Sequence, residues 1–387
     1  MKKHTIKIVC ASSLILLLST NAHAFAIKQP IGDLNTNLKI FGFTQLYARG
    51  SNNTLNNDTD SNIHFGAQNV RLGVNYSAGP IRSKLLMDFS KPTTDVSGVG
   101  LPNYIQDSFI SYHHDYFLTA KFGLIKMPHG MGYTTAGWNL DTAERSFDKP
   151  LALERNVGLM LSGRNIGFGY NAKVNGLEMG HERAWKGFGY DVMYGNQAGR
   201  SGAVVGAKKG DSNSYAIRGM FDWTELLHTE ISYGESKSAA GLGVLNDVDY
   251  KSLNIGLESH FGRSSIKFEH YDSENIQGVK GWDISTYSFT KTYLLTNTFE
   301  PSLKHIQGSS SKDGVKTTLG NTYLGFNYYI APFDNKIDRN SKRNRNAHRI
   351  QLNYIISSGD TAGYSVEWNG LKGKLGDSWL AQYQYKF

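Results

Sequence analysis

The chain lacks the features that mark a helical membrane protein or a disulfide-stabilised secreted protein. Its 387 residues include one cysteine, Cys10, and eight prolines. Beyond residue 24 there is no long apolar run, and the mean hydropathy is −0.40. Membrane-spanning helices, which need about 20 apolar residues, are therefore excluded. Strands that alternate apolar and polar side chains escape such an average, so a membrane-spanning β-barrel stays possible.

Motifs of catalysis and metal binding are missing as well. There is no G-x-S-x-G nucleophile elbow and no H-E-x-x-H zinc motif, and the histidines are scattered. The formal net charge is +8, and removing three lysines of the amino-terminal segment leaves about +5, too little to indicate nucleic-acid binding. We expect no catalytic residues, no metal, no cofactor and no nucleic-acid partner. A hydrolase would gain support only if His and acidic side chains converged at one end of the fold.

The amino terminus has the composition of an export signal. Residues 2–7 include three lysines, residues 8–18 are mostly apolar, and Ala22-His23-Ala24 has the spacing of a cleavage site. We expect residues 1–24 to be a secretory signal peptide and residues 25–387 to form one exported domain. Since Cys10 lies in the signal, the mature protein would have no thiol and no disulfide.

The last nine residues have the pattern of a membrane-facing strand. Side chains of a strand alternate between its two faces, and here one face is aromatic or small while the other is mostly polar. The first face comprises Trp379, Ala381, Tyr383, Tyr385 and Phe387. In outer-membrane barrels such an apolar face meets lipid, and the polar face meets a water-filled lumen. An edge strand of a soluble sandwich is the alternative.

The same alternation recurs along the chain and predicts about 16 strands. Clear examples are 70–76, 81–89, 118–124, 166–174, 188–194, 215–223, 227–233, 324–330 and 350–356. Longer polar segments at 51–61, 198–214, 236–247, 297–320 and 359–376 alternate with short turns. The number of strands is open at 281–296 and at 334–346. We expect an all-β fold, a transmembrane antiparallel up-and-down β-barrel with short turns at the periplasmic end.

One stretch of the chain resembles a known family, the phosphate- and polyphosphate-selective porins O and P. Residues 118–130, Leu-Thr-Ala-Lys-Phe-Gly-Leu-Ile-Lys-Met-Pro-His-Gly, are similar to the family's strand that leads into its third, constricting loop. Gly123, Lys126, Pro128 and Gly130 match. Residues 153–155 resemble the end of that loop, and residues 324–332 resemble a late strand. The resemblance implies a homotrimer of 16-stranded barrels in which lysines and arginines set the selectivity of the pore.

In each predicted strand, every second side chain faces the lumen, and these positions indicate which cations line the pore. We expect the following residues to line it and to bind anions: Arg71, Arg82, Lys84, Lys121, Lys126 and Arg218. The first four come from neighbouring early strands and should share one wall, where a low-dielectric surface concentrates anions. Guanidinium groups also bind phosphate or carboxylate in bidentate fashion. The alternative is that these are ordinary wall charges, paired with acidic neighbours.

The segment 127–153, after the fifth strand, is long enough to fold into the barrel. As an infolded third loop it would constrict the pore and place both signs of charge there, through His129, Asp141, Glu144 and Arg145. An exposed surface loop is the alternative, and the family resemblance favours the constriction.

These expectations combine into a porin in the outer membrane of a Gram-negative bacterium. It would let small hydrophilic solutes, anionic or neutral, diffuse passively, with a preference for anions and with phosphate-like anions among them. Its partners would be outer-membrane lipid, lipopolysaccharide and two further copies in a homotrimer. A surface-exposed barrel that acts as an adhesin or binding receptor, without significant conductance, is the second interpretation.

Overall fold

The computed structural model describes residues 26–31, 34–51, 63–91, 104–166, 187–196, 213–224, 227–236, 248–276, 278–330, 346–359 and 377–387. The predicted signal peptide, most of the predicted polar loops and most of the open segment 334–346 lie outside these ranges. Within them, no helix combines the length and the apolar character that crossing a membrane requires.

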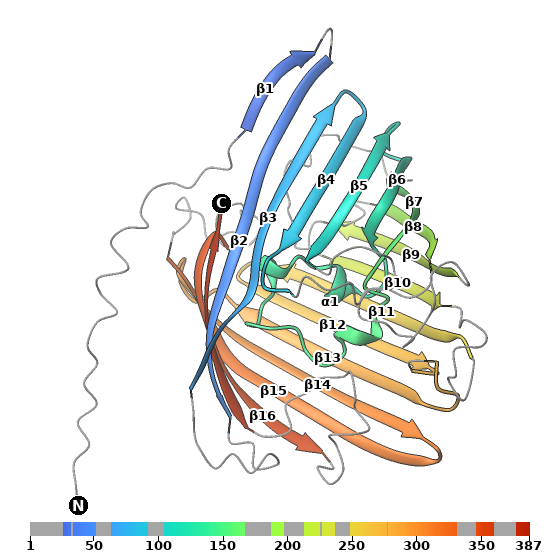
Figure 1. Ribbon diagram of the computed structural model, residues 1–387. Coiled ribbons are helices and arrows are strands. Elements are labelled where there is room, and N and C mark those ends of the chain that lie inside the picture. Colours follow the sequence, from blue (N-terminus) through green and yellow to red (C-terminus); the bar gives the residue numbers. More distant parts are fainter. Residues whose placement is uncertain are drawn as a thin grey trace, which may run out of the picture.

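Sixteen strands form a closed antiparallel barrel, and a seventeenth, β1, extends it. Each barrel strand pairs with the next along the chain, and β17 pairs with β2 to close the ring, with Tyr383 opposite Leu46 (Figure 1). The strands are β1 Ala26–Ile31, β2 Leu34–Ser51, β3 His64–Ala78, β4 Ile81–Asp88, β5 Ile105–His113, β6 Thr119–Lys126, β7 Arg155–Ile166, β8 Gly187–Asn196, β9 Asn213–Thr224, β10 Leu227–Ser236, β11 Tyr250–Phe261, β12 Ser264–Glu274, β13 Asp283–Tyr293, β14 Phe299–Lys312, β15 Val315–Tyr329, β16 His348–Gly359 and β17 Ser378–Lys386.

The outer surface of the barrel is a belt of exposed apolar side chains. Phe122 and Ile110 are 67% and 62% exposed, whereas their neighbours Ser111 and Lys121 face inward. Similar outward residues are Leu159, Phe188, Val192, Ile217, Trp223, Ile231, Ile255, Leu257, Leu324, Ile350 and Ile356. Exposed apolar area on this scale is stable only against another apolar medium, and a closed barrel leaves no unpaired strand edge in it. The predicted transmembrane barrel is confirmed.

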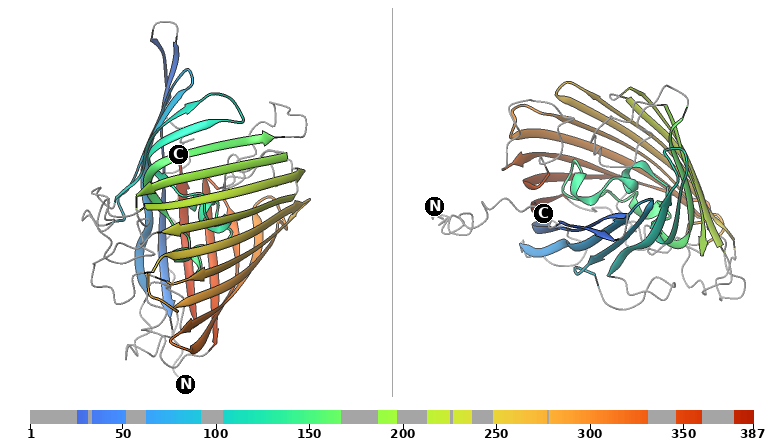
Figure 2. Two further views of the ribbon diagram at one scale, coloured as in Figure 1. Left: turned by 90° about the vertical axis from the view of Figure 1, so that its right-hand side faces the viewer. Right: turned by 90° about the horizontal axis from the view of Figure 1, so that it is seen from above.

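Short turns occur at both ends of the barrel, and the long connection between β6 and β7 lies at the end opposite the carboxyl terminus, together with the tight turn at 313–314. Among the described residues, the end that holds the carboxyl terminus has the short turns at 79–80, 114–118, 262–263 and 294–298. The same end holds the hairpin of β1 and β2, which projects beyond the barrel (Figures 1 and 2). There, β1 pairs with Leu34–Lys39 of β2, farther from the barrel than the point where Phe387 pairs with Gly42.

The structure corrects two strand predictions and decides one that the sequence left open. Residues 297–320 are not a loop, because β14 and β15 pair across a tight turn at Asp313 and Gly314. Both faces are polar at this end, where no lipid imposes alternation. Residues 281–296 hold the single strand β13. The strand predicted at 166–174 lies almost wholly outside the described residues, and β7 was missed because a register shift between Gly163 and Ile166 interrupts its alternation.

The connection between β6 and β7, residues 127–154, folds into the barrel as predicted. We call it the lumen loop. It contains the short helix α1 (Met131–Thr134) and two 3-10 turns at Gly137–Asn139 and Lys149–Leu151. Seen along the barrel axis, it lies inside the ring of strands (Figure 2), and its position defines the candidate site.

Candidate functional site

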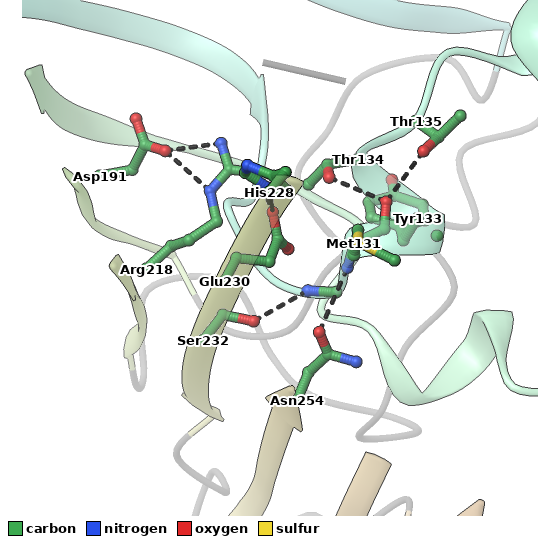
Figure 3. Close-up of polar contacts among 12 residues, drawn as sticks. Met131, Tyr133, Thr134, Thr135, Asp191, Arg218, His228, Glu230, Ser232 and Asn254 are labelled. Carbon is green, nitrogen blue, oxygen red and sulfur yellow. Dashed lines mark hydrogen bonds and ion pairs between the residues drawn. The ribbon is translucent and has the colours of Figure 1, made fainter. Parts of the chain in front are cut away.

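The first part of the lumen loop is fixed to the wall opposite its origin. The backbone N–H of Gly130 donates to Ser232 Oγ of β10 at 3.1 Å, and that of Met131 donates to Asn254 Oδ1 of β11 at 3.2 Å (Figure 3). The N–H of Gly132 donates to Glu269 Oε1 of β12 at 2.9 Å. Three consecutive N–H groups at the start of α1 thus find side-chain acceptors on three neighbouring strands, as the unpaired donors of a helix start require.

The second part of the loop crosses to the strands at both ends of the chain. Gln45 of β2 donates to the carbonyl of Gly137, and Gln384 of β17 donates to that of Trp138, each at 3.1 Å. The two glutamines also bond to each other at 2.6 Å. Further bonds join Leu140 to Arg349, Asp141 to Asn327, and Ala143 to Asn353 and Gln382. The loop therefore spans the lumen instead of lying on one wall.

An apolar cluster fixes the loop on the side of β11–β13. Met127, Phe147, Leu151 and Leu153 of the loop are each at most 2% exposed. They belong to one buried cluster with wall residues that include Tyr250, Tyr271, Trp282 and Ile284. Burial of side chains of this size stabilises by about 1.5–3 kcal/mol each, so packing holds the loop at least as firmly as its hydrogen bonds.

A cluster of cations lies where the loop leaves the wall. Asp107 of β5 accepts from Lys84 of β4 at 2.7 Å and from Arg155 Nε of β7 at 2.9 Å. Arg155 also donates to the hydroxyl of Tyr133 in α1 at 3.0 Å. Burial, the largest cause, and Glu154 raise the pKa of the Tyr133 phenol, so this hydroxyl stays protonated. Arg155 thus joins the early wall to the loop.

Lys126 and Arg145 bind the carbonyl groups of α1. The Lys126 ammonium donates to the carbonyls of Tyr133 and Thr134 at 2.8 and 3.3 Å. Arg145 donates to the carbonyls on either side of this pair, and burial lowers the pKa of its guanidinium to about 10. Arg145 therefore remains charged at neutral pH, and both side chains hold the loop backbone. Their predicted contact with permeating anions stays a prediction.

The other cations expected on the early wall do lie there. Arg82 on β4, Ser111 on β5 and Lys121 on β6 form one cross-strand row on the inner face. Arg82 is exposed near the carboxyl-terminal end of the barrel. Arg71 on β3 lies nearer the opposite end, pairs with Asp88 at 2.9 Å and lies over the ring of Phe43. The early wall thus carries cations at two levels, and their role in permeation stays a prediction.

Arg218 belongs to a different wall and to a buried charge network. Its guanidinium is 3% exposed and pairs with Asp191 at 2.6 Å, and it lies 3.7 Å from Glu230 (Figure 3). His228 bonds to Glu230 at 3.1 Å and to Asp222 at 2.7 Å. The network lies on β8–β10, away from Arg71 and Lys84.

His129 belongs to the lumen loop and is fully buried between the loop and the wall. Its Nε2 lies 3.0 Å from the carbonyl oxygen of Ser252 and therefore carries the proton, and its ring packs against Tyr271. Burial lowers the pKa of the imidazole to about 4. His129 is therefore a neutral anchor at pH 7.

Asp141, Glu144 and Arg145 line a cavity between the lumen loop and the wall formed by β12–β14. Together with the solvent-filled space into which it opens, the cavity has a volume of about 630 Å³. The carboxylate of Asp141 in the loop pairs with Lys267 of β12 at 2.7 Å, and this ion pair joins the loop to the wall across the cavity. Other lining residues with charged or hydroxyl groups are Thr135, Thr142, Ser146, Asp148, Lys149, Glu269, Ser288, Thr290 and Lys304.

Sequence reasoning did not single out Arg155 or Lys304. Arg155 begins β7, a strand that was not predicted, and Lys304 lies within the segment predicted to be a loop. The signal that could have found Lys304 is weak, because β14 is polar on both faces over residues 307–312 and so looks like part of a loop. Among the described residues, no group of three His, Cys, Asp or Glu side chains is placed to hold a metal ion.

The chain was compared with known proteins. No protein-family model and no curated protein sequence matches it. The anion-selective porin from Comamonas acidovorans is 11% identical, with 91% of this chain and all of that chain covered and a TM-score of 0.59. The outer membrane channel DcaP of Acinetobacter baumannii is 12% identical over 91% of this chain and 97% of that chain, with a TM-score of 0.56. In-vitro folded OmpT of Vibrio cholerae in its trimer form is 12% identical over 91% and 99%, with a TM-score of 0.56. The chain is therefore similar in fold to outer-membrane porins.

Proposed function

We propose that this protein is an outer-membrane porin that lets small hydrophilic solutes diffuse across the membrane and prefers anions. The observation that carries the proposal is a closed barrel with an apolar outside and a charged inside, narrowed by an infolded loop. A barrel of this strand number is wide enough to hold a water-filled channel. Charged side chains around such a channel select among the ions that pass.

The anion preference rests on the charges near the early wall. Arg71, Lys84 and Arg155 pair with Asp88 and Asp107. Arg145 at the loop is a further cation without an ion pair to these carboxylates, and Arg82 adds an exposed positive charge on the same wall. A surplus of positive charge in a confined, low-dielectric space raises the local concentration of anions. Phosphate-like anions fit guanidinium groups well, and the anion-selective porin from Comamonas acidovorans supports the same direction.

We extend the proposal to a homotrimer in the outer membrane, in contact with lipid and lipopolysaccharide. The trimer form of Vibrio cholerae OmpT, which has a similar fold, supports it. Membership of the porin O and P family remains a prediction from residues 118–130. The adhesin interpretation gains no support from the described residues, because the longer polar loops that would bind a receptor lie outside them.

Reversal potentials under a salt gradient test the anion preference. Replacing Arg82, Lys84 and Lys121 together with glutamine should shift the reversal potential toward cations, and repeating the measurement with phosphate in place of chloride tests the solute class. Arg263→Gln, which removes a charge at the exposed turn between β11 and β12, is the control. A triple variant with unchanged relative permeability would contradict the role of these cations. A purified protein that forms no channels would contradict the porin itself.

A further inference from the structure

The cavity between the lumen loop and β12–β14 contains charges that the protein does not pair with one another. On the wall, Lys267, Thr290 and Lys304 are direct cross-strand neighbours on β12, β13 and β14, and all three line the cavity. Lys267 is occupied by Asp141 at 2.7 Å and Glu258 at 3.5 Å. Within the described ranges, the ammonium of Lys304 has no hydrogen bond and no ion pair. Lys304 is thus a cation available to a solute.

Two carboxylates in the same cavity have only neutral hydrogen-bond partners among the described residues. Asp148 of the loop accepts a hydrogen bond from the hydroxyl of Ser146 at 2.7 Å. Glu269 of β12 accepts from the N–H of Gly132 at 2.9 Å and from the amide of Asn254 at 3.0 Å. In the described part of the chain, neither lies within ion-pair distance of a lysine or arginine. The charge of Asp148 repels that of Glu269, and Lys304 attracts Glu269 from beyond ion-pair distance. A cationic group between them would relieve that repulsion.

The spacing between these groups sets the size of the solute. Glu269 lies opposite Ser288 and Lys304 lies opposite Thr290, and Ser288 and Thr290 are two residues apart on β13. The two rows are therefore about 7 Å apart. An α-amino acid, with about 3 Å between its ammonium nitrogen and its carboxylate and a hydrogen bond of about 2.8 Å at each end, spans roughly 9 Å. A flexible lysine side chain accommodates the difference.

We propose that this cavity is a binding subsite for a small zwitterion, whose carboxylate binds Lys304 and Thr290 and whose ammonium group binds between Asp148 and Glu269. The inference rests on the proposed pore, since the cavity lies inside the barrel, between the lumen loop and the inner wall. Opposite charges at a fixed spacing orient such a solute along one direction, whereas a simple anion makes a favourable contact with the lysine alone. Binding must stay weak, because a site on a diffusion path has to release its solute.

Ion current through single channels in planar bilayers tests the subsite with three solutes of equal size. Alanine is the zwitterion, lactate has the carboxylate without the ammonium group, and lactamide is neutral. We expect alanine to reduce the current in a saturable manner at concentrations where lactamide has no saturable effect and lactate has a weaker one. Lys304→Gln should raise the half-blocking alanine concentration about fivefold, which corresponds to about 1 kcal/mol for a partly exposed ion pair.

Matched variants separate the subsite from general effects of charge. Lys316→Gln removes the same charge at an exposed position on β15 outside the cavity, and it should leave the block by alanine unchanged. Asp148→Asn should weaken block by alanine more than block by lactate, whereas Asp313→Asn, at an exposed turn, should affect neither. Equal block by lactate and alanine, or an unchanged block in Lys304→Gln, overturns the subsite while the channel itself stands. Absence of any channel current would instead count against the proposed porin.

Discussion

Replacing Phe147 with alanine should release the lumen loop while leaving the barrel intact. Phe147 is 2% exposed and belongs to the apolar cluster that holds the loop against the wall. Truncating a buried phenylalanine to alanine costs about 3–5 kcal/mol, whereas a neutral hydrogen bond of the kind that fixes the loop elsewhere contributes about 1 kcal/mol. The equilibrium between docked and released loop should therefore shift toward release by a factor of at least about 100.

Conductance and proteolysis report this release independently. A released loop leaves the lumen wider and more variable, so single-channel conductance and current noise should both rise. The same movement exposes Arg145, which is followed by Ser146, so trypsin should cut the loop at this position in folded protein. The barrel is held by backbone pairing of β2–β17, which the substitution does not touch, so the folded form should keep its migration in unheated detergent gels.

Phe122→Ala is the matched control, because Phe122 lies on the outer face and is 67% exposed. It removes the same atoms from the lipid-facing belt, so the loop should stay resistant to trypsin and the conductance should not change. If Phe147→Ala has the conductance and trypsin resistance of the unaltered protein, the loop is not held by packing and this reasoning fails.

Three further changes test two contacts of the loop and one close approach within the barrel. Burial holds the pKa of His129 near 4, against about 6.5 for an exposed imidazole, so the released loop binds the proton more readily than the docked loop. Loop docking should therefore weaken by up to about 3 kcal/mol as pH falls from 6.5 to 4, and current noise should rise. His129→Gln should lose this part of the pH dependence. Asp141→Asn and Lys267→Gln should couple by about 1 kcal/mol in a double-mutant cycle of trypsin cleavage rates, and strict additivity would show that their ion pair contributes nothing. Gly123→Ala should lower the temperature at which the barrel unfolds in detergent gels, because Gly123 has φ +130° and a Cβ there would lie 2.3 Å from the carbonyl oxygen of Ser108; an unchanged temperature would contradict this.

The sequence predicted the barrel because lipid constrains one face of every strand. Where that constraint acts, as at Phe122 or Ile217, alternation is visible in the residues themselves. It fails at β14 and β15 near the turn at Asp313, where both faces meet water and a polar strand looks like a loop. The infolding of the lumen loop was predicted from a resemblance at residues 118–130, since length alone allows an exposed loop equally well.

The candidate site was predicted less completely than the fold. Strand order alone placed Arg82 and Lys121 on one wall, because neighbouring strands share an inner face. The partners of these charges depend on strand register and on the path of the loop, and local sequence determines neither. Arg155 illustrates the limit, since its contacts with Asp107 and Tyr133 join residues 48 and 22 positions away.

The bonds of Gln45 and Gln384 to the lumen loop bear on how the protein assembles. These residues belong to the first and last strands of the ring, and 339 positions separate them along the chain. The loop can complete its contacts with both only when the two ends of the chain have met, so sealing of the cylinder and seating of the loop are a single late event. An assembly intermediate with an open seam would therefore have an unconstricted interior, and the narrow passage would arise in the same step that makes the wall continuous.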